Sequence, residues 1–193
     1  MKQFRYDGKI YEYRRDDLQC QLGERCVEVP IAIDILSKFK YGNILEVGNV
    51  LHKYIDSNLT TIDKHEEAEN CINADVLNFI PDEKPDLIIS ISTIEHIGFD
   101  MGEVVEPGKT QKFFEWVMET LPVGGELFFT FPIGYNKTLD EFIQDNIWKL
   151  HSFGAMKRIN QDNEWIECDI DWKAKYGEPY EYGNMIFIGR ILK

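Results

Sequence analysis

The chain has 193 residues, of which 34 are acidic and 21 basic, so its formal net charge is −13. Because this excess of negative charge repels phosphate backbones and anionic lipid headgroups, we expect neither a nucleic-acid partner nor a membrane partner. No apolar run has transmembrane length and no signal-like segment follows the first residue, which predicts a cytoplasmic protein.

The length predicts one domain over residues 1–193, with residues 1–24 as an irregular arm that lies on it. The cysteines are scattered, without a Cys-x-x-Cys pair or a histidine at zinc-finger spacing. We therefore expect free thiols and no metal site. The sequence carries no signal for an oligomeric state.

The first predicted helix begins at Pro30, which suits the first helical turn because its missing N–H would have no partner there. Ile31, Ile35, Leu36 and Phe39 fall on one face, so this helix should run to about Phe39. Helical spacing also predicts helices over 108–121 and about 138–146.

Short apolar runs predict the strands, and the run 86–91 ("DLIISI") lacks alternation, as in a strand covered on both faces. The predicted strands are 44–47, 59–62, 71–74, 86–91 and 126–131, followed by weaker pieces at 156–159 and 164–167 and a last strand in "NMIFIGRIL". Strands that alternate with helical or loop crossovers indicate βαβ units, so we expect an α/β fold with a parallel sheet.

Candidate site residues follow the first four predicted strands: Gly48, then Asp63, then Asp75, then Glu95 and His96 within the stretch after the fourth strand. In an open parallel sheet, ligands bind beyond the carboxyl ends of the strands. A single aspartate after a strand is more often a turn former than a ligand, and a single glycine is most often just a turn. The ordered series nevertheless predicts a binding site at this edge.

In that order, "NILEVGN", "TTIDKHE", "NADVLNF", "PDLIISISTIEHI" and "LPVGGELFFTFP" resemble the successive motifs of class I S-adenosylmethionine-dependent methyltransferases. The resemblance covers roughly residues 43–132. It implies a doubly wound Rossmann-like fold, with a mostly parallel seven-stranded sheet and an antiparallel C-terminal strand. "LEVGNVL", "STIEHIGFD" and "FPIGYN" also resemble small members associated with glycan or surface-sugar modification.

The resemblance also implies cofactor contacts near the first two strands. Glu46 would lie near the methionine amino group of S-adenosylmethionine, and Gly48 and Asn49 would line its methionine and ribose end. Asp63 would bind the ribose hydroxyls through its carboxylate.

Further along the chain, the resemblance implies that Asp75 and the backbone of Val76 face the adenine ring, with Ile91 under the cofactor. The chain departs from the family where further glycines usually follow the first motif, because Val50 and His52 occupy those positions. A Cβ at Val50 narrows this turn and requires an ordinary backbone conformation.

For the chemistry, His96 is the candidate base for an acceptor hydroxyl, since the unperturbed pKa of histidine is about 6.5. Glu95 is the second catalytic candidate. The alternative for this pair is a structural role in shaping the loop. Tyr135 and Asn136 are candidates to face the acceptor, and the alternative for them is a plain turn.

The resulting hypothesis is methyl transfer from S-adenosylmethionine to a small-molecule or glycan acceptor, with a sugar or glycan hydroxyl as the leading candidate. A noncatalytic binding protein with the same fold is one alternative, favoured by Val50 and His52. A nicotinamide-dependent oxidoreductase is disfavoured, because G-x-G-x-x-G is absent. Asp100, Glu103 and Glu106 are expected in a solvated acidic lid.

Overall fold

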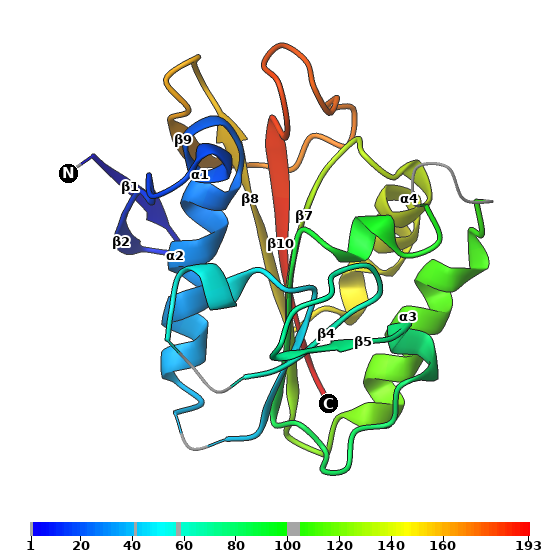
Figure 1. Cartoon of the computed structure of the whole chain (residues 1–193). Helices are drawn as coiled ribbons and strands as arrows, with labels where there is room; N and C mark the ends of the chain where they lie inside the picture. The colour runs from blue at the N-terminus through cyan, green and yellow to red at the C-terminus, as the bar shows by residue number, and fades with distance from the viewer. Residues whose placement is uncertain (1, 41, 57–58, 100–104) are drawn as a thin grey trace.

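The computed structural model describes residues 2–40, 42–56, 59–99 and 105–193, so Asp100 and Glu103 of the expected lid lie outside the described residues. The described chain forms one large twisted sheet, with helices against both of its faces (Figure 1). A separate two-stranded hairpin consists of β1 (Gln3–Tyr6) and β2 (Lys9–Glu12).

The large sheet has the strand order β5-β4-β3-β6-β7-β10-β8-β9. Its strands are β3 (Ile44–Val47), β4 (Thr60–Asp63), β5 (Cys71–Asn73), β6 (Leu87–Ile91), β7 (Glu126–Pro132), β8 (Ser152–Arg158), β9 (Trp165–Cys168) and β10 (Met185–Leu192). The first five of these pair in parallel, and β10 lies antiparallel between β7 and β8. The doubly wound α/β class is confirmed. The described part of the chain gives the sheet eight strands instead of seven, because β9 pairs with the outer side of β8.

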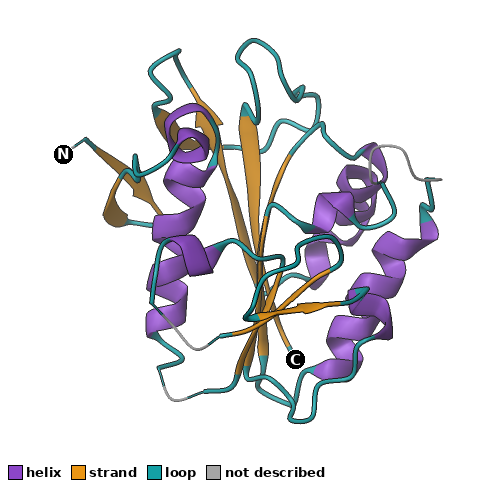
Figure 2. Ribbon diagram, in the orientation of Figure 1, coloured by secondary structure: helices purple, strands orange, loops and turns teal. Residues whose placement is uncertain are grey.

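The helices lie in two layers (Figure 2). They are α1 (Leu18–Leu22), α2 (Arg25–Ser37), α3 (Gly108–Thr120) and α4 (Lys137–Asn146), with short 3-10 turns η1 (Leu51–Lys53), η2 (Val76–Asn78), η3 (Ile94–His96) and η4 (Ile147–Lys149). Buried side chains of α2 pack against one face of the sheet, and those of α3 and α4 pack against the other. Strand β6 is buried throughout because Ile89 faces the first layer and Ile88 the second.

The start of α2 differs from the prediction. The helix begins at Arg25, and Pro30 lies inside it. A proline inside a helix leaves the carbonyl four residues earlier without its usual donor. That carbonyl belongs to Cys26, and it accepts the N–H of Arg14 at 3.1 Å. The N-terminal segment therefore supplies the hydrogen bond that Pro30 removes, and the helix continues through the proline.

The segment that we expected to be an irregular arm contains β1, β2 and α1, joined by turns and loops. Phe4 and Tyr13 are buried in the α2 layer of the core. The Tyr13 hydroxyl accepts the N–H of Trp165 at 2.7 Å, which ties this segment to β9. Among the described residues, no helix has the length and apolar character needed to cross a membrane.

Gly189 in β10 lies against aromatic side chains of the core, so a substitution at this position tests how tightly these rings are packed. A Cβ added to Gly189 would lie 2.7 Å from Cε1 of Phe129 and 2.8 Å from Cε1 of Phe187. We expect Gly189→Ala to lower the free energy of unfolding by about 1–3 kcal/mol, as overpacked cores do. Urea unfolding measures this change.

Gly108→Ala is the matched control, because nothing lies within 4 Å of an added Cβ at the start of α3. The same methyl group should leave stability unchanged or raise it by up to about 1 kcal/mol. Equal destabilisation by the two substitutions would contradict the packing argument.

Candidate functional site

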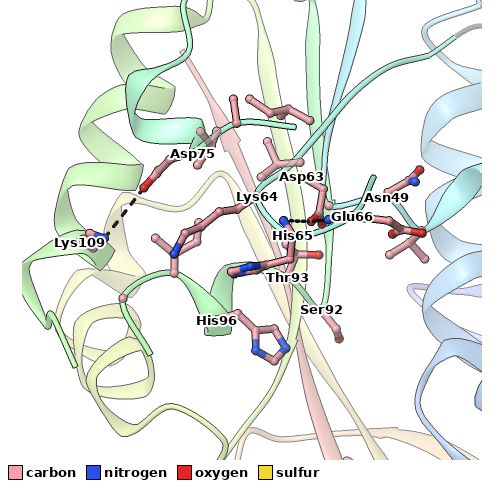
Figure 3. A pocket seen from close by; sticks show the side chains of 18 of the residues that line it. Asn49, Asp63, Lys64, His65, Glu66, Asp75, Ser92, Thr93, His96 and Lys109 are labelled. Atoms are coloured by element: carbon pink, nitrogen blue, oxygen red, sulfur yellow. Dashed lines mark hydrogen bonds and ion pairs between the residues drawn. The ribbon is translucent and has the colours of Figure 1, made fainter. Parts of the chain in front are cut away.

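A cavity of about 500 Å³ lies at the carboxyl ends of β3, β4, β5 and β6. The order of the strands reverses between β3 and β6, since β4 and β5 continue to one side of β3 while β6 starts on the other. Such a switch point is where open α/β sheets bind ligands. Figure 3 shows Asp63, Asp75, Thr93 and His96 around this space, from the segments that follow β4, β5 and β6.

The turn after β3 forms one wall of the cavity. Gly48 has a φ of +92°, and its N–H donates to the carbonyl of Ile62 at 2.8 Å. A Cβ at Gly48 would lie 2.8 Å from the Cβ of Thr93 and would also overlap its hydroxyl. Both the backbone conformation and the approach of Thr93 therefore require glycine here, before any ligand is considered.

Glu46 lies beneath this turn, fully buried and outside the cavity lining. Its Oε1 accepts the N–H groups of Val50 at 3.1 Å and Leu51 at 2.8 Å. Its Oε2 has no hydrogen-bond partner among the described residues. Burial raises the pKa of Glu46 to about 7, although the two backbone donors act in the opposite direction.

Val50 takes an ordinary right-handed conformation, with φ −103° and ψ −50°, so the turn does not need a second glycine. Its side chain lines the cavity, next to Gly48 and Asn49. His52 is exposed and does not line the cavity. The departure from the family pattern at these two positions therefore does not disturb the turn.

Asp63 lines the cavity at the end of β4, where the sequence predicted a ribose contact. Its Oδ1 accepts the N–H groups of His65 at 2.8 Å and Glu66 at 2.9 Å (Figure 3). These bonds fix the carboxylate at the cavity edge. His65 is exposed and also contributes to the lining.

Asp75 and Val76, which follow β5, also line the cavity. The Asp75 carboxylate accepts the N–H of Leu77 at 3.0 Å and so caps η2, and its Oδ2 lies 3.9 Å from Nζ of Lys109. Lys109 belongs to the first turn of α3, and no pattern in the sequence marked it. Asp75 therefore combines a capping role with its place in the lining.

Ile91 and Asn136 do not lie where the sequence hypothesis needs them. The Ile91 side chain is buried in the α2 layer of the core, away from the lining. The Asn136 side chain caps α4, accepting from Thr138 at 3.0 Å and donating to the carbonyl of Glu95 at 2.8 Å. The pleat of β6 directs the Ile91 side chain into the core, and the Asn136 side chain is used to cap the start of α4.

His96 lies between this cavity and a second one of about 610 Å³, and it contributes to the lining of both. Its Nδ1 is 3.2 Å from the Tyr135 hydroxyl, and its Nε2 is 4.0 Å from Oε1 of Glu95. Glu95 and Tyr135 line only the second cavity. The predicted catalytic pair and one predicted acceptor residue thus come together beside the first cavity.

Sequence reasoning missed Arg25, which also lines both cavities. Its guanidinium donates to Glu28 at 3.0 Å and to the carbonyls of Ile91 at 2.9 Å and Ser92 at 3.2 Å. The sequence signal that could have identified Arg25 is the set of charged residues Glu24, Arg25 and Glu28 beside an apolar helical stretch. Within the described residues, no group of three or more His, Cys, Asp or Glu side chains is placed to hold a metal ion.

No protein-family model matches the sequence, and no curated protein is similar to it in sequence. The N-methyltransferase NodS of Bradyrhizobium japonicum, solved with S-adenosylhomocysteine, is 13% identical with a TM-score of 0.49, covering 86% of this chain and 89% of that one. The glycopeptide N-methyltransferase MtfA, also with S-adenosylhomocysteine, is 10% identical with a TM-score of 0.49, covering 91% and 96%. A possible histamine N-methyltransferase of Thermotoga maritima is 13% identical with a TM-score of 0.46, covering 82% and 86%. At this similarity, the fold assignment rests on the strand order of the chain itself.

The buried Glu46 predicts a pH-dependent difference between the wild type and Glu46→Gln, whose amide oxygen can still accept from Val50 and Leu51. The folded-state pKa of about 7 exceeds the ordinary value of 4.5, so the folded protein binds more protons between these pH values. The wild type therefore loses stability relative to the variant as the pH rises through this window. The relative change should be on the order of 3 kcal/mol, by urea unfolding at pH 4.5 and pH 8.

Glu119→Gln is the control for this comparison, because Glu119 is exposed on α3. Its difference from the wild type should be the same at both pH values. A Glu46→Gln difference that is also independent of pH would contradict the buried-carboxyl argument.

Proposed function

We propose that this protein is an S-adenosylmethionine-dependent methyltransferase that acts on a small polar acceptor in the cytoplasm. One observation carries the proposal. One cavity at the switch point of the sheet is lined by Gly48, Asp63, Asp75 and His96, which the sequence singled out after β3, β4, β5 and β6, together with Val76. This arrangement supports the resemblance of the sequence motifs to the methyltransferase family.

The residues of the first cavity fit S-adenosylmethionine. The volume of about 500 Å³ falls within the range of small-molecule sites. Asp63 would accept bonds from the ribose hydroxyls, Gly48 and Asn49 would contact the methionine end, and Ile62 and Val76 offer apolar surface beside the adenine. When bound, the cofactor supplies an electrophilic methyl group on its sulfonium.

The task of the protein is then to hold an acceptor in line with that methyl group, and positioning supplies much of the rate. In our proposal the second cavity holds the acceptor, because it adjoins the first at His96, Ser92 and Arg25. The acceptor expected from the sequence is a sugar or glycan hydroxyl. His96, which contacts Tyr135, would take up the proton of that hydroxyl as the new bond forms.

A nicotinamide-dependent oxidoreductase is a weaker candidate for a structural reason. Dinucleotide sites use free N–H groups after the first strand to bind a pyrophosphate. Here the N–H groups of Val50 and Leu51 already donate to the carboxylate of Glu46. A phosphate would have to displace a buried acidic group that also repels it.

A noncatalytic binding protein with this fold remains the alternative from another class. It would bind the same cofactor without turning it over. Detection of a methylated product separates it from the enzyme, while retention of cofactor by the purified protein in native mass spectrometry is expected for both.

Binding of the cofactor predicts a thermal shift. A ligand that binds only the folded state stabilises it by about 2.7 kcal/mol at a hundredfold excess over its Kd. For a domain of this size, each kcal/mol raises Tm by roughly 2–4 °C. Saturating S-adenosylmethionine or S-adenosylhomocysteine should therefore raise Tm by several degrees, and NAD(H) and NADP(H) should not. A shift with the dinucleotides alone would refute the proposal.

Asp63→Asn tests the proposed ribose contact. The amide oxygen of the variant can still accept the N–H groups of His65 and Glu66, but the negative charge of the carboxylate is lost. The Kd for S-adenosylhomocysteine, measured by calorimetry, should rise about ten- to a hundredfold. Asp82→Asn, in the exposed loop before β6, removes the same charge outside the cavity and should leave the Kd unchanged.

Replacement of His96 tests the proposed base. His96→Ala should lower kcat by about 10²–10⁴ with a sugar acceptor that the wild type methylates, while the Kd for S-adenosylhomocysteine stays the same. His52→Ala, at an exposed position outside both cavities, should retain full activity. Loss of cofactor binding in His96→Ala would assign this side chain a structural role instead.

A further inference from the structure

The second cavity contains two buried acidic side chains. Glu95 is 2% exposed and Glu24 is 9% exposed, and both contribute to the lining. Oε2 of Glu24 accepts the N–H of Gly183 at 3.0 Å. Oε2 of Glu95 has no hydrogen-bond partner among the described residues. A buried carboxyl oxygen without a partner, on the wall of a cavity, indicates a donor that comes from a ligand.

The guanidinium of Arg25, which also lines this cavity, does not supply that donor. The guanidinium of Arg25 donates to Glu28 and to two main-chain carbonyls of the strand end. The other oxygen of Glu28 accepts the Ser92 hydroxyl at 2.5 Å, so Arg25, Glu28 and Ser92 form a closed group. Arg25 thus pairs with the fully buried Glu28, and this pair leaves two acidic groups facing the cavity.

Burial and the neighbouring carboxylates raise the pKa of both Glu24 and Glu95, with Arg25 acting in the opposite direction. A cationic ligand would reverse this cost, because an opposite charge within a few ångströms favours the ionised carboxylate. The cavity therefore gains more from an ammonium group than from a neutral hydroxyl of the same size.

Aromatic rings form another part of the wall. Tyr135, Tyr176, Tyr182 and Phe99 line the second cavity. The rings of Tyr135 and Tyr176 meet edge to face, with centroids 4.9 Å apart. Ring faces attract ammonium groups and also pack against sugar or hydrocarbon rings. Acidic groups beside aromatic rings are thus a combination suited to an organic amine.

We propose that the second cavity binds an acceptor that carries a positively charged amino group, held by Glu95 and Glu24 against the tyrosine wall. The proposal rests on the proposed function in one respect, since it takes this cavity to be the acceptor site. It narrows the acceptor from small polar molecules to amines, among which amino sugars would also meet the glycan expectation.

Matched pairs of probes test the proposal. Glucosamine and glucose differ at one position by an amine and a hydroxyl, as do benzylamine and benzyl alcohol. With the protein saturated with S-adenosylhomocysteine, NMR titration should give a Kd at least about tenfold lower for an amine than for its alcohol in at least one pair. Equal or weaker binding of both amines, or no binding of either, would overturn the proposal.

Glu95→Gln should abolish that preference, because the amide keeps the size of the side chain but not its charge. Asp140→Asn is the control. Asp140 is also buried with an oxygen that lacks a partner among the described residues, but it does not line the second cavity, and its bond from Gly134 can be kept by the amide. A preference that persists in Glu95→Gln would refute the role of this carboxylate.

The Kd of each variant for S-adenosylhomocysteine shows whether an effect is local or a loss of fold. The same measurement separates the two proposals. A wild type that binds S-adenosylhomocysteine without preferring amines would retain the proposed function and lose this inference. A wild type that prefers amines without binding S-adenosylhomocysteine, with the titration run on the protein alone, would retain the inference and lose the cofactor assignment.

Discussion

The buried carboxylate of Glu46 is the constraint on which the binding edge of this sheet depends. Two backbone N–H groups emerge after β3, those of Val50 and Leu51, and both would be unpaired at the start of a short turn. One oxygen of Glu46 accepts both. Desolvation still outweighs these bonds, since the pKa of the group rises to about 7. The turn is therefore held from inside by a side chain that the fold keeps buried at a cost in stability.

A second dependence runs from the N-terminus to the same edge. The N–H of Arg14 satisfies the carbonyl that Pro30 leaves open, so the N-terminal segment and the first turn of α2 are fixed together. That turn carries Glu24 and Arg25, and Gln19 of α1 also lines both cavities. In Figure 1, α1 and α2 lie on one side of the sheet, and α3 and α4 lie on the other. The segment expected to be an arm thus builds part of the site.

The sequence predicted the strands well where burial dictates residue type. The strand over 44–47 coincides with β3, and β6 and β7 differ from their predictions by one residue at one end. The sequence prediction was wrong for the start of α2. A proline suits the first turn of a helix, but it is also tolerated inside a helix when another segment donates to the carbonyl that the proline leaves without a donor. Positions carried over from a family fix a place along the chain but not the direction of a side chain. Ile91 and Asn136 therefore hold the expected positions and face elsewhere.

The second cavity lay beyond sequence reasoning because its walls come from residues 19–25, 92–99, 132–135 and 176–182, which no local pattern connects. Its cost to the fold is nevertheless visible in the structure. Ser92 has a φ of +37°, and the unpartnered oxygen of Glu95 is buried. Strain and unpaired polar groups of this kind persist where the surroundings impose them, and they gather at functional sites. Ser92 lines both cavities, and Glu95 is the neighbour of His96, which also lines both. The strained backbone and the unpaired oxygen therefore fall at the junction of the two cavities.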